Sequence, residues 1–176
     1  MAKLIILMGP TGAGKSVQGD FLAQDLNGVH LSSGNLLRQD PEAAKMIANG
    51  KLAPAHEVER IVGEAIAKVP EDQAIILDGF PRTISNLEWM DRELPAMHRT
   101  VTDVILLELD VATCIARLNL RERADDSPEA VQEKLEAYKV STKPVLDHYE
   151  STGVIKHVDG RGTPDEVRAL VKAALS

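Results

Sequence analysis

The sequence predicts an α/β fold with three layers, in which a five-stranded parallel sheet is flanked by helices. Five short apolar runs alternate along the chain with segments of helical pattern, and such alternation is typical of parallel sheets with crossover helices. The 176 residues suffice for one domain with a substantial core. The runs expected to form strands are Leu4–Met8, Val29–Leu31, Ala74–Leu77, Val104–Leu109 and Val154–Val158.

The first apolar run leads directly into a glycine-rich segment, Gly9–Ser16, which reads GPTGAGKS. This segment matches the pattern G-x-x-x-x-G-K-[ST], and a helical segment, Val17–Leu26, follows it. Glycines let backbone N–H groups approach phosphate oxygens, and the helix N-terminus adds partial positive charge. The pattern indicates a P-loop, in which Lys15 reaches the β- and γ-phosphates and Ser16 lies near Mg²⁺. The alternative is an ordinary glycine-rich turn between a strand and a helix.

The segment between the second and third predicted strands is longer than one crossover helix requires. We expect a short helix that opens at Pro41 and ends near Gly50, and a second helix over about Ala55–Val69, whose apolar residues recur with a helical period. These two helices predict a small insertion over the edge of the sheet, which could carry a second ligand.

Polar residues follow the third predicted strand, in the string DGFPRT. Because ligands bind at the carboxyl ends of parallel strands, we expect these residues at the site. Asp78, at the end of a buried strand near the P-loop, suits a role in holding Mg²⁺-bound water. Arg82 lies close to it along the chain, although on its own it could be a solvated arginine in a Gly-Pro turn.

The C-terminal half of the chain continues the alternation of helices and strands. A helix is expected over Val111–Arg123, and the next begins at Pro128 with Ser127 as its N-cap. That helix is predicted to be kinked or interrupted near Pro144 and to end at Gly153. A capping box in the string TPDE starts the final helix.

Composition and charge limit the classes of function. The formal net charge is −7 and no long Lys/Arg block occurs, so nucleic acid is not expected as the main partner. No apolar run approaches the length that crosses a bilayer, so no membrane association is expected. Cys114 is the only cysteine, which excludes an internal disulfide and a cysteine-based zinc site and makes a cytoplasmic location the expectation.

In chain order the sequence contains GPTGAGKSVQ, HLSSGNLLR, GKLAP, ILDGFPRTISN, RERADD, KLEAY and VDGRGTPDEV. This series resembles the motifs of the nucleoside monophosphate kinases, most closely the adenylate kinase family in its short-lid form. The resemblance implies a single kinase domain with a core of residues 1–31, 70–119 and 127–176. It also implies an insertion at 32–69 that binds the nucleoside monophosphate, and a short lid at 120–126. The lid lacks the long insertion that sometimes carries zinc, so no zinc is expected.

The resemblance further implies the reaction ATP + AMP ⇌ 2 ADP, with Mg²⁺ as cofactor, a role in adenine nucleotide homeostasis and a monomeric enzyme. Residues that match ATP-binding positions are Gly12, Ala13, Gly14, Lys15, Ser16, Val17, Arg117, Arg121 and Gly162. Those that match AMP-binding positions are Ser33, Arg38, Lys51, Leu52, Ala53, Val58, Gly79, Phe80, Pro81, Arg82, Asn86, Arg123 and Lys134. Catalytic roles are expected for Lys15, Arg82, Arg121, Arg123 and Lys134. The candidates for Mg²⁺ are Ser16 and, through water, Asp78.

Four positions depart from the family pattern. Lys134 stands where arginine is usual, which keeps the charge but loses the bidentate fork. Asn35 stands where aspartate is usual, which removes a carboxylate from the surroundings of Mg²⁺. Asn86 replaces a glutamine that reads the acceptor base, and Val17 replaces a threonine. Together these changes are consistent with reduced or altered activity.

Three alternatives remain open at this point. A kinase of the UMP/CMP type is one, because of Asn86, although FPRT rather than FPRN, and Ser33 rather than alanine, favour adenine by resemblance. A nucleotide-binding module with weakened catalysis is the second, motivated by Asn35 and Lys134. A P-loop switch or motor is the third, and the small size of the chain argues against it.

Overall fold

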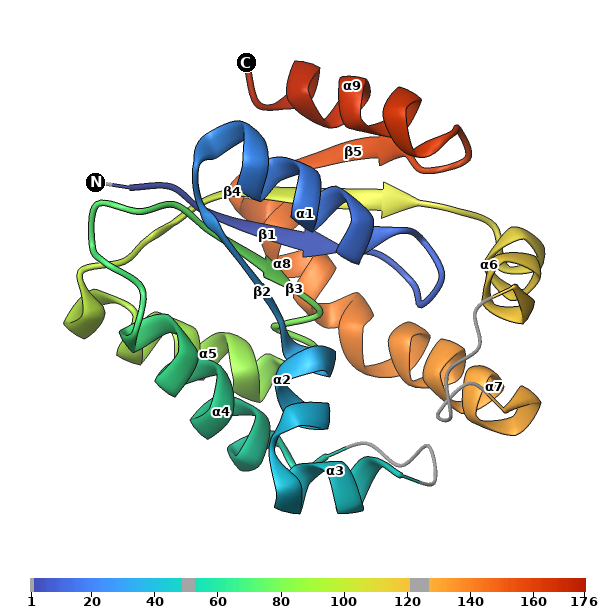
Figure 1. Ribbon diagram of the computed structural model, residues 1–176, viewed down its shortest axis with the longest axis horizontal. Helices are drawn as coiled ribbons and strands as arrows, with labels where there is room; N and C mark the ends of the chain where they lie inside the picture. The colour runs from blue at the N-terminus through green and yellow to red at the C-terminus, as the bar shows by residue number, and fades with distance from the viewer. Residues whose placement is uncertain (1, 49–52, 121–126) are drawn as a thin grey trace.

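The computed structural model describes residues 2–48, 53–120 and 127–176 (Figure 1). At its centre lies a five-stranded, all-parallel sheet in the order β2-β3-β1-β4-β5. The strands are β1 (Leu4–Met8), β2 (Val29–Ser32), β3 (Ile75–Asp78), β4 (Val101–Glu108) and β5 (Ile155–Asp159). All five predicted strands are confirmed: the first has the predicted bounds, and the ends of the others shift by three residues at most.

Helices connect the strands and cover both faces of the sheet (Figure 1). In the described part of the chain they are α1 (Lys15–Leu26), α2 (Ser33–Gln39), α3 (Pro41–Ile47), α4 (Ala55–Ala67), α5 (Ile84–Glu93), α6 (Val111–Asn119), α7 (Pro128–Ala137), α8 (Lys143–Thr152) and α9 (Pro164–Ala174). The three-layer α/β architecture that the sequence predicts is therefore present.

The two faces of the sheet form two separate parts of the core. One face packs against α1 and α9 through residues such as Leu22 and Val167, and the other packs against α4, α5 and α8 through residues such as Met90 and Val145. Because both faces are covered, every residue of β1 is buried. Each fully buried Leu or Ile contributes about 1.5–3 kcal/mol to stability. The central strand thus anchors the loop that follows it.

Two helices are present to which the sequence analysis assigns no particular residues, α2 and α5. Each begins at a hydroxyl N-cap: Ser32 Oγ accepts from the backbone N–H of Asn35 at 3.4 Å, and Thr83 Oγ1 accepts from that of Asn86 at 3.2 Å. Side-chain caps satisfy backbone donors that would otherwise be orphaned at a helix start. The segment between β2 and β3 consequently holds three helices, α2 to α4, rather than the two expected.

Helix α6 is shorter than predicted. The expected helix over Val111–Arg123 ends at Asn119, with Leu120 as its C-cap, so the prediction is wrong at this end. The side chain of Leu120 is 87% exposed, so continuing the helix past it would gain no burial there. Residues 121–126, which include most of the predicted lid, lie outside the described residues.

The predicted interruption near Pro144 is confirmed. Helix α7 begins after the N-cap Ser127, as expected, and a π-helical turn at Tyr138–Thr142 separates it from α8, which ends at Gly153. Pro144 lacks the N–H that would complete the regular ladder, and a widened turn is one way to accommodate this.

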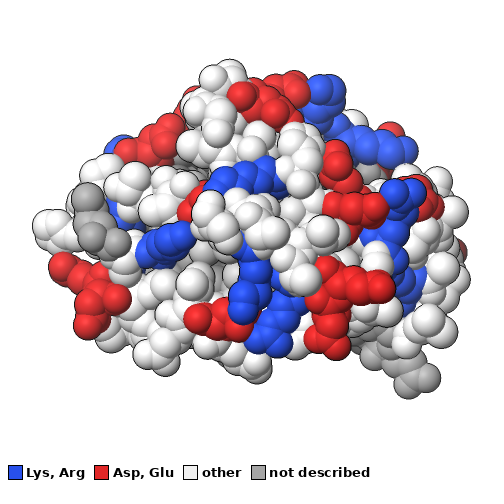
Figure 2. All heavy atoms as spheres, turned by 90° about the horizontal axis from the view of Figure 1, so that it is seen from above, with Lys and Arg blue, Asp and Glu red and all other residues white. Residues whose placement is uncertain are grey.

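Figure 2 shows the molecule from above, which is the side where α9 lies in Figure 1. Basic and acidic side chains lie interspersed on this face. Arg168 and Lys172 of α9 both pair with Asp25 of α1, at 2.6 Å and 3.6 Å.

None of the helices in residues 2–48, 53–120 and 127–176 has the length and apolar character that a membrane span needs.

Candidate active site

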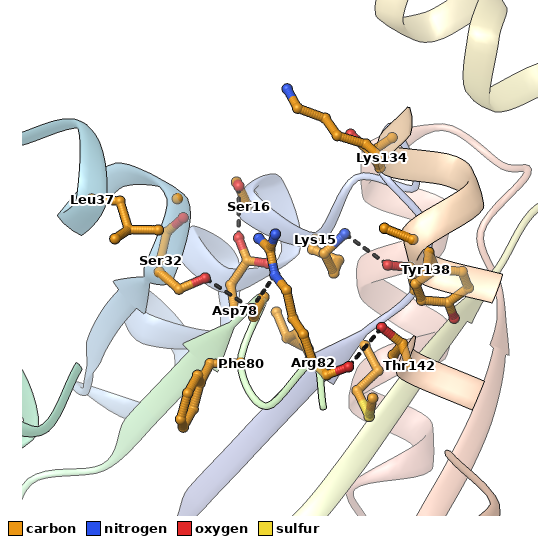
Figure 3. A pocket seen from close by; sticks show the side chains of 18 of the residues that line it. Lys15, Ser16, Ser32, Leu37, Asp78, Phe80, Arg82, Lys134, Tyr138 and Thr142 are labelled. Carbon is orange, nitrogen blue, oxygen red and sulfur yellow. Dashed lines mark hydrogen bonds between the residues drawn. The ribbon is translucent and has the colours of Figure 1, made fainter. Parts of the chain in front are cut away.

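A cleft of about 470 Å³ opens at the carboxyl ends of β1 and β3 (Figure 3). Its walls come from the glycine-rich loop, from α2 and the start of α4, from the segment between β3 and α5, and from α6, α7 and the π-helical turn. Parallel strands place their carboxyl ends at the same edge, so segments far apart in the sequence meet here.

The loop after β1 has the geometry of a phosphate cradle. Gly12 and Gly14 adopt φ values of +84° and +91°, which glycine tolerates without strain. A Cβ on Gly12 would lie 2.8 Å from the carbonyl oxygen of Cys114, so a larger residue would collide with α6. Gly14 is the N-cap of α1, so the positive end of a twelve-residue helix faces the cleft. The loop is therefore a P-loop by conformation as well as by pattern.

The ammonium group of Lys15 lies over this loop. Its Nζ donates to the carbonyl oxygens of Gly9 and Pro10, each at 2.9 Å. Hydrogen bonds from an ammonium to phosphate oxygens are stronger than those to neutral carbonyls. A phosphate bound in the cradle can therefore draw Lys15 away from the loop, as the sequence predicts for the β- and γ-phosphates.

The two Mg²⁺ candidates lie together at the edge of the cradle. Ser16 Oγ donates to Asp78 Oδ2 at 2.7 Å, and Asp78 is 3% exposed. Burial by itself raises the pKa of the Asp78 carboxyl. The neighbouring His30 ring, the charge of Lys15 and the Ser16 hydroxyl outweigh burial and hold that pKa below its usual value. An ionised carboxylate beside a hydroxyl is an oxygen donor set that fits Mg²⁺ and its waters.

His30 supports Asp78 from behind. Its Nε2 lies 3.7 Å from Asp78 Oδ2, and its Nδ1 lies 2.8 Å from Asp20 Oδ1. Burial disfavours the charged ring, but the two carboxylates outweigh it and raise the pKa of His30. The ring fits because residue 19 is glycine: a Cβ there would lie 2.4 Å from Nε2. The structure thus places His30 in contact with a carboxylate of the site, a role that the sequence analysis does not assign to it.

Next to Asp78 in the cleft, Ser33, Gly79 and Arg82 form a compact group. Ser33 Oγ and Arg82 Nε both donate to the carbonyl oxygen of Gly79, at 2.8 Å and 2.7 Å. Gly79 has a φ of +76°, and a Cβ there would lie 2.8 Å from Ser33 Oγ. The group holds the Arg82 guanidinium in the cleft on the side of Asp78 and Lys15 (Figure 3).

Arg38 of α2 also lines the cleft. Its Nη2 donates to Asn35 Oδ1 at 2.7 Å. This hydrogen bond to the uncharged amide of Asn35 helps to orient the Arg38 guanidinium. A guanidinium can bind phosphate through two parallel hydrogen bonds, and an oriented one loses less freedom when it does so.

The wall of the cleft that α6 and α7 form contributes two further cationic side chains. Arg117 Nη2 donates to the carbonyl oxygens of Gly160 and Gly162, at 2.9 Å and 3.3 Å, which ties α6 to the loop after β5. Lys134 lines the cleft from α7. Arg117 and Gly162, which the resemblance matches to the adenine of ATP, are therefore in direct contact.

The cleft brings together most of the residues that the resemblance singles out. The lining residues among them are Gly12, Gly14, Lys15, Ser16, Val17, Arg117, Ser33, Arg38, Ala53, Val58, Asp78, Gly79, Phe80, Pro81, Arg82, Asn86 and Lys134. Ala13 packs into the core below the loop, and Gly162 contacts the site through Arg117. Lys51, Leu52, Arg121 and Arg123 lie outside the described residues, so their predicted roles stay predictions.

Sequence reasoning missed several residues of the site. Leu37, Tyr138 and Thr142 line the cleft, and Glu59 accepts a hydrogen bond from Asn86 Nδ2 at 2.9 Å. Burial raises the pKa of the Tyr138 hydroxyl to about 12, so it stays protonated. Leu37 falls within the HLSSGNLLR motif and Tyr138 within KLEAY, and these motifs could have indicated both residues. Thr142 and Glu59 carry no local signal, because only the fold brings them to their partners at the site.

A P-loop on a parallel α/β sheet, facing a second group of cationic and hydrogen-bonding residues across one cleft, defines a phosphotransferase of the nucleoside monophosphate kinase class. The family model for adenylate kinase matches residues 7–154. This chain therefore belongs to the adenylate kinase family.

Curated relatives agree along the whole chain. An adenylate kinase of Thermus thermophilus is 36% identical over 187 residues, covering 99% of this chain and 98% of the relative. That of Prochlorococcus marinus (strain MIT 9211) is 33% identical, with 99% and 98% covered. That of Synechococcus sp. (strain RCC307) is 32% identical over the full length of both chains. These names support ATP:AMP phosphoryl transfer, and nothing in the comparisons favours the UMP/CMP alternative.

Proposed function

We propose that this chain catalyses reversible phosphoryl transfer from ATP to AMP, giving two ADP. The observation that carries the proposal is that the P-loop with Lys15 and the group around Arg82 line one continuous cleft. Phosphoryl transfer needs alignment of the two substrates and neutralisation of charge rather than a prominent general base. A cleft with a phosphate cradle on one side and guanidinium groups on the other supplies both.

On the donor side, the P-loop backbone and Lys15 hold the β- and γ-phosphates of ATP, and Arg117 lies near the adenine. Adenylate kinases in general use ATP with Mg²⁺, and when bound the ion neutralises charge on the phosphates. We assign its surroundings to the Ser16 hydroxyl and, through water, to the Asp78 carboxylate. Their contact at 2.7 Å and the ionised state of Asp78 support the assignment.

On the acceptor side, the insertion of residues 32–69 together with the segment after β3 holds AMP. Arg38 and Arg82 bind the AMP phosphate, while apolar residues such as Val58 pack against the base. Lys134 adds charge from α7. From the resemblance, we expect Arg121 and Arg123, which lie outside the described residues, to add further charge. Most of the acceptor residues in described parts of the chain line the same cleft as Lys15, which supports this division.

A coupled assay with ATP·Mg²⁺ and a panel of acceptors, AMP, CMP, UMP and GMP, tests the proposal. AMP is expected to give the highest kcat/KM. A higher value for CMP or UMP would favour the UMP/CMP alternative. If the purified protein binds ATP but forms no ADP with any acceptor, the weakened nucleotide-binding module is the correct description.

We infer that the enzyme works as a monomer in the cytoplasm. Its single cysteine, Cys114, is fully buried and forms no disulfide in the described parts of the chain, which fits a reducing compartment, and the resemblance to the family implies a monomer. Size-exclusion chromatography with light scattering, at concentrations used in the assay, tests the oligomeric state. A dimeric mass would overturn this part of the proposal.

A further inference from the structure

The acceptor side of the cleft contains an apolar slot with a polar end. Leu37, Ile47, Ala53 and Val58 line the cleft and pack around one small cluster, and Asn86 lines the same cleft. A nucleobase has apolar faces and a polar edge, so this slot suits the base of the acceptor nucleotide. This inference rests on the proposed function, and it identifies the side chains that form hydrogen bonds with the polar edge of the acceptor base.

The side-chain amide of Asn86 has a fixed orientation. Asn86 is the third residue of α5, and its Oδ1 accepts from the backbone N–H of Arg82 at 3.2 Å, which extends the cap that Thr83 forms. Since a backbone N–H can only donate, the atom facing it is the oxygen. The Nδ2 group therefore lies on the other side, where it donates to Glu59 Oε1 at 2.9 Å.

In this orientation Asn86 Oδ1 faces the backbone N–H of Arg82, so it is not available to accept a hydrogen bond from the base. A side chain as short as that of Asn86 reaches back to its own helix cap, and Asn86 is only 3% exposed. Adenine presents an acceptor at N1 and a donor at its exocyclic amino group. Asn86 can offer its remaining N–H to the acceptor, but a different group has to accept from the amino group.

Glu59 of α4 is the group placed to do so. It follows Val58, which lines the slot, and it is half-buried. Its Oε1 receives only uncharged donors, Asn86 Nδ2 and, at 3.4 Å, Ser85 Oγ. In the described parts of the chain no cation pairs with this carboxylate, and no group donates to Oε2. A half-buried carboxylate oxygen that no protein group occupies keeps its acceptor capacity for a donor on a ligand.

We propose that Glu59 determines acceptor specificity by accepting a hydrogen bond from the exocyclic amino group of adenine, while Asn86 donates to N1. Together, the Asn86 N–H and the Glu59 carboxylate offer adenine one donor and one acceptor. The longer side-chain amide of a glutamine could offer both by itself. Hypoxanthine has a carbonyl oxygen in place of the amino group and a hydrogen on N1, so it would set an acceptor against the Glu59 carboxylate and a donor against the Asn86 N–H. Glu59 thus selects for AMP and against IMP.

The test compares three acceptors, AMP, purine riboside 5′-monophosphate and IMP, with ATP·Mg²⁺ as donor. Purine riboside 5′-monophosphate lacks the amino group and is otherwise isosteric with AMP. The wild-type kcat/KM is expected to favour AMP over this analogue by about 10-fold or more, as for a hydrogen bond to a charged group. Glu59→Ala should reduce the ratio to within about 3-fold by lowering the AMP value, with the analogue unchanged. Glu59→Gln, whose amide can donate, should raise the IMP/AMP ratio about 10-fold or more.

Glu64→Ala is the matched control, because Glu64 lies on the same helix but is exposed and pairs with Arg60, at 3.2 Å, rather than with Asn86. All three acceptor ratios should stay at their wild-type values in this variant. An unchanged KM for ATP in each Glu59 variant shows that the fold is intact. Equal losses for AMP and its analogue, with an unchanged IMP/AMP ratio in Glu59→Gln, would overturn the inference. A wild-type protein that phosphorylates no AMP would overturn the proposed function instead, and this appears before any variant is made.

Discussion

Thr142 Oγ1 donates to the backbone carbonyl oxygen of Arg82 at 3.1 Å. Thr142 ends the π-helical turn between α7 and α8, and Arg82 carries the guanidinium on the acceptor side of the cleft. The hydrogen bond therefore joins the irregular turn to the segment that positions Arg82. Thr142 is only 5% exposed, so its hydroxyl is well shielded from water.

Thr142→Val, which removes the hydroxyl and keeps the shape, should weaken the use of AMP. A hydrogen bond of this kind is worth about 0.5–1.5 kcal/mol, so kcat/KM for AMP should fall about 2- to 10-fold. The KM for ATP should not change, because the donor side is untouched. Steady-state kinetics with each substrate varied in turn measures both. Thr152→Val is the control, since its hydroxyl bonds only to Tyr149 of its own helix, at 3.0 Å. A change in the KM for ATP alone would contradict the role.

Ser16 and Asp78 should set the Mg²⁺ requirement. Ser16→Ala removes the hydroxyl that donates to Asp78 Oδ2 at 2.7 Å, and Asp78→Asn removes the buried charge. Each variant should need about 10-fold more Mg²⁺ for half-maximal rate at fixed ATP, because each loses part of the oxygen donor set around the ion. Initial rates over a Mg²⁺ titration give the value. Ser151→Ala, whose Oγ donates to His148 in α8, should leave the titration unchanged. Identical titrations for all variants would exclude the assigned Mg²⁺ position.

Lys15→Met should abolish most of the turnover without unfolding the protein. The Lys15 ammonium lies over the P-loop, where its charge stabilises the transferring phosphoryl group. Losing one such donor costs about 100-fold or more in kcat. The thermal transition should stay close to that of the wild type, because the variant keeps an unbranched side chain of similar length and the hydrogen bonds from Nζ to the loop contribute only modestly to stability. Lys139→Met, at an exposed ion pair with Glu136, is the control. A kcat within a few-fold of wild type would mean that catalysis does not pass through the P-loop.

The strands and the P-loop are predictable from sequence because their signals are local. A strand buried on both faces, such as β1, reads as an unbroken apolar run, and eight contiguous residues form the phosphate cradle. Helix α2, with the sequence SGNLLRQ, opens with residues of poor helix propensity. It forms because Ser32 caps it and because Leu37 packs against Ile61 of α4, and neither propensity nor pattern conveys that contact.

The unpredicted parts of the site depend on contacts distant in sequence. Thr142 reaches Arg82 across 60 positions, and Asn86 reaches Glu59 across 27. Such pairs have no spacing rule, so the residue types alone could not identify them. The sequence indicated that Asn86 departs from the family, and the structure adds the partner that fixes its amide.

His157 should make stability depend on pH. Its Nδ1 lies 2.9 Å from Glu108 Oε1 and its Nε2 lies 2.8 Å from Glu150 Oε1, which ties β5 to β4 and α8. The hydrogen bond with Glu108, together with Glu150, raises the pKa of His157 above the usual 6.5. A histidine whose pKa is raised in the folded state stabilises the fold fully below its unfolded pKa. That contribution is lost as the pH rises through the folded pKa.

His157→Gln should therefore lower the melting temperature at about pH 6, where the wild-type ring is charged, and change it little at about pH 9, where it is neutral. The effect should be modest, since the His157 side chain is 45% exposed and solvent screens the two ion pairs. Melting curves by circular dichroism at both pH values, in low and high salt, measure it. His56→Gln is the control, because that side chain is 76% exposed and lies 3.7 Å from a single carboxylate, Glu57. A loss of equal size at both pH values would show that His157 acts by packing. Because salt screens the paired charges, the difference in melting temperature between the wild type and His157→Gln should shrink in high salt.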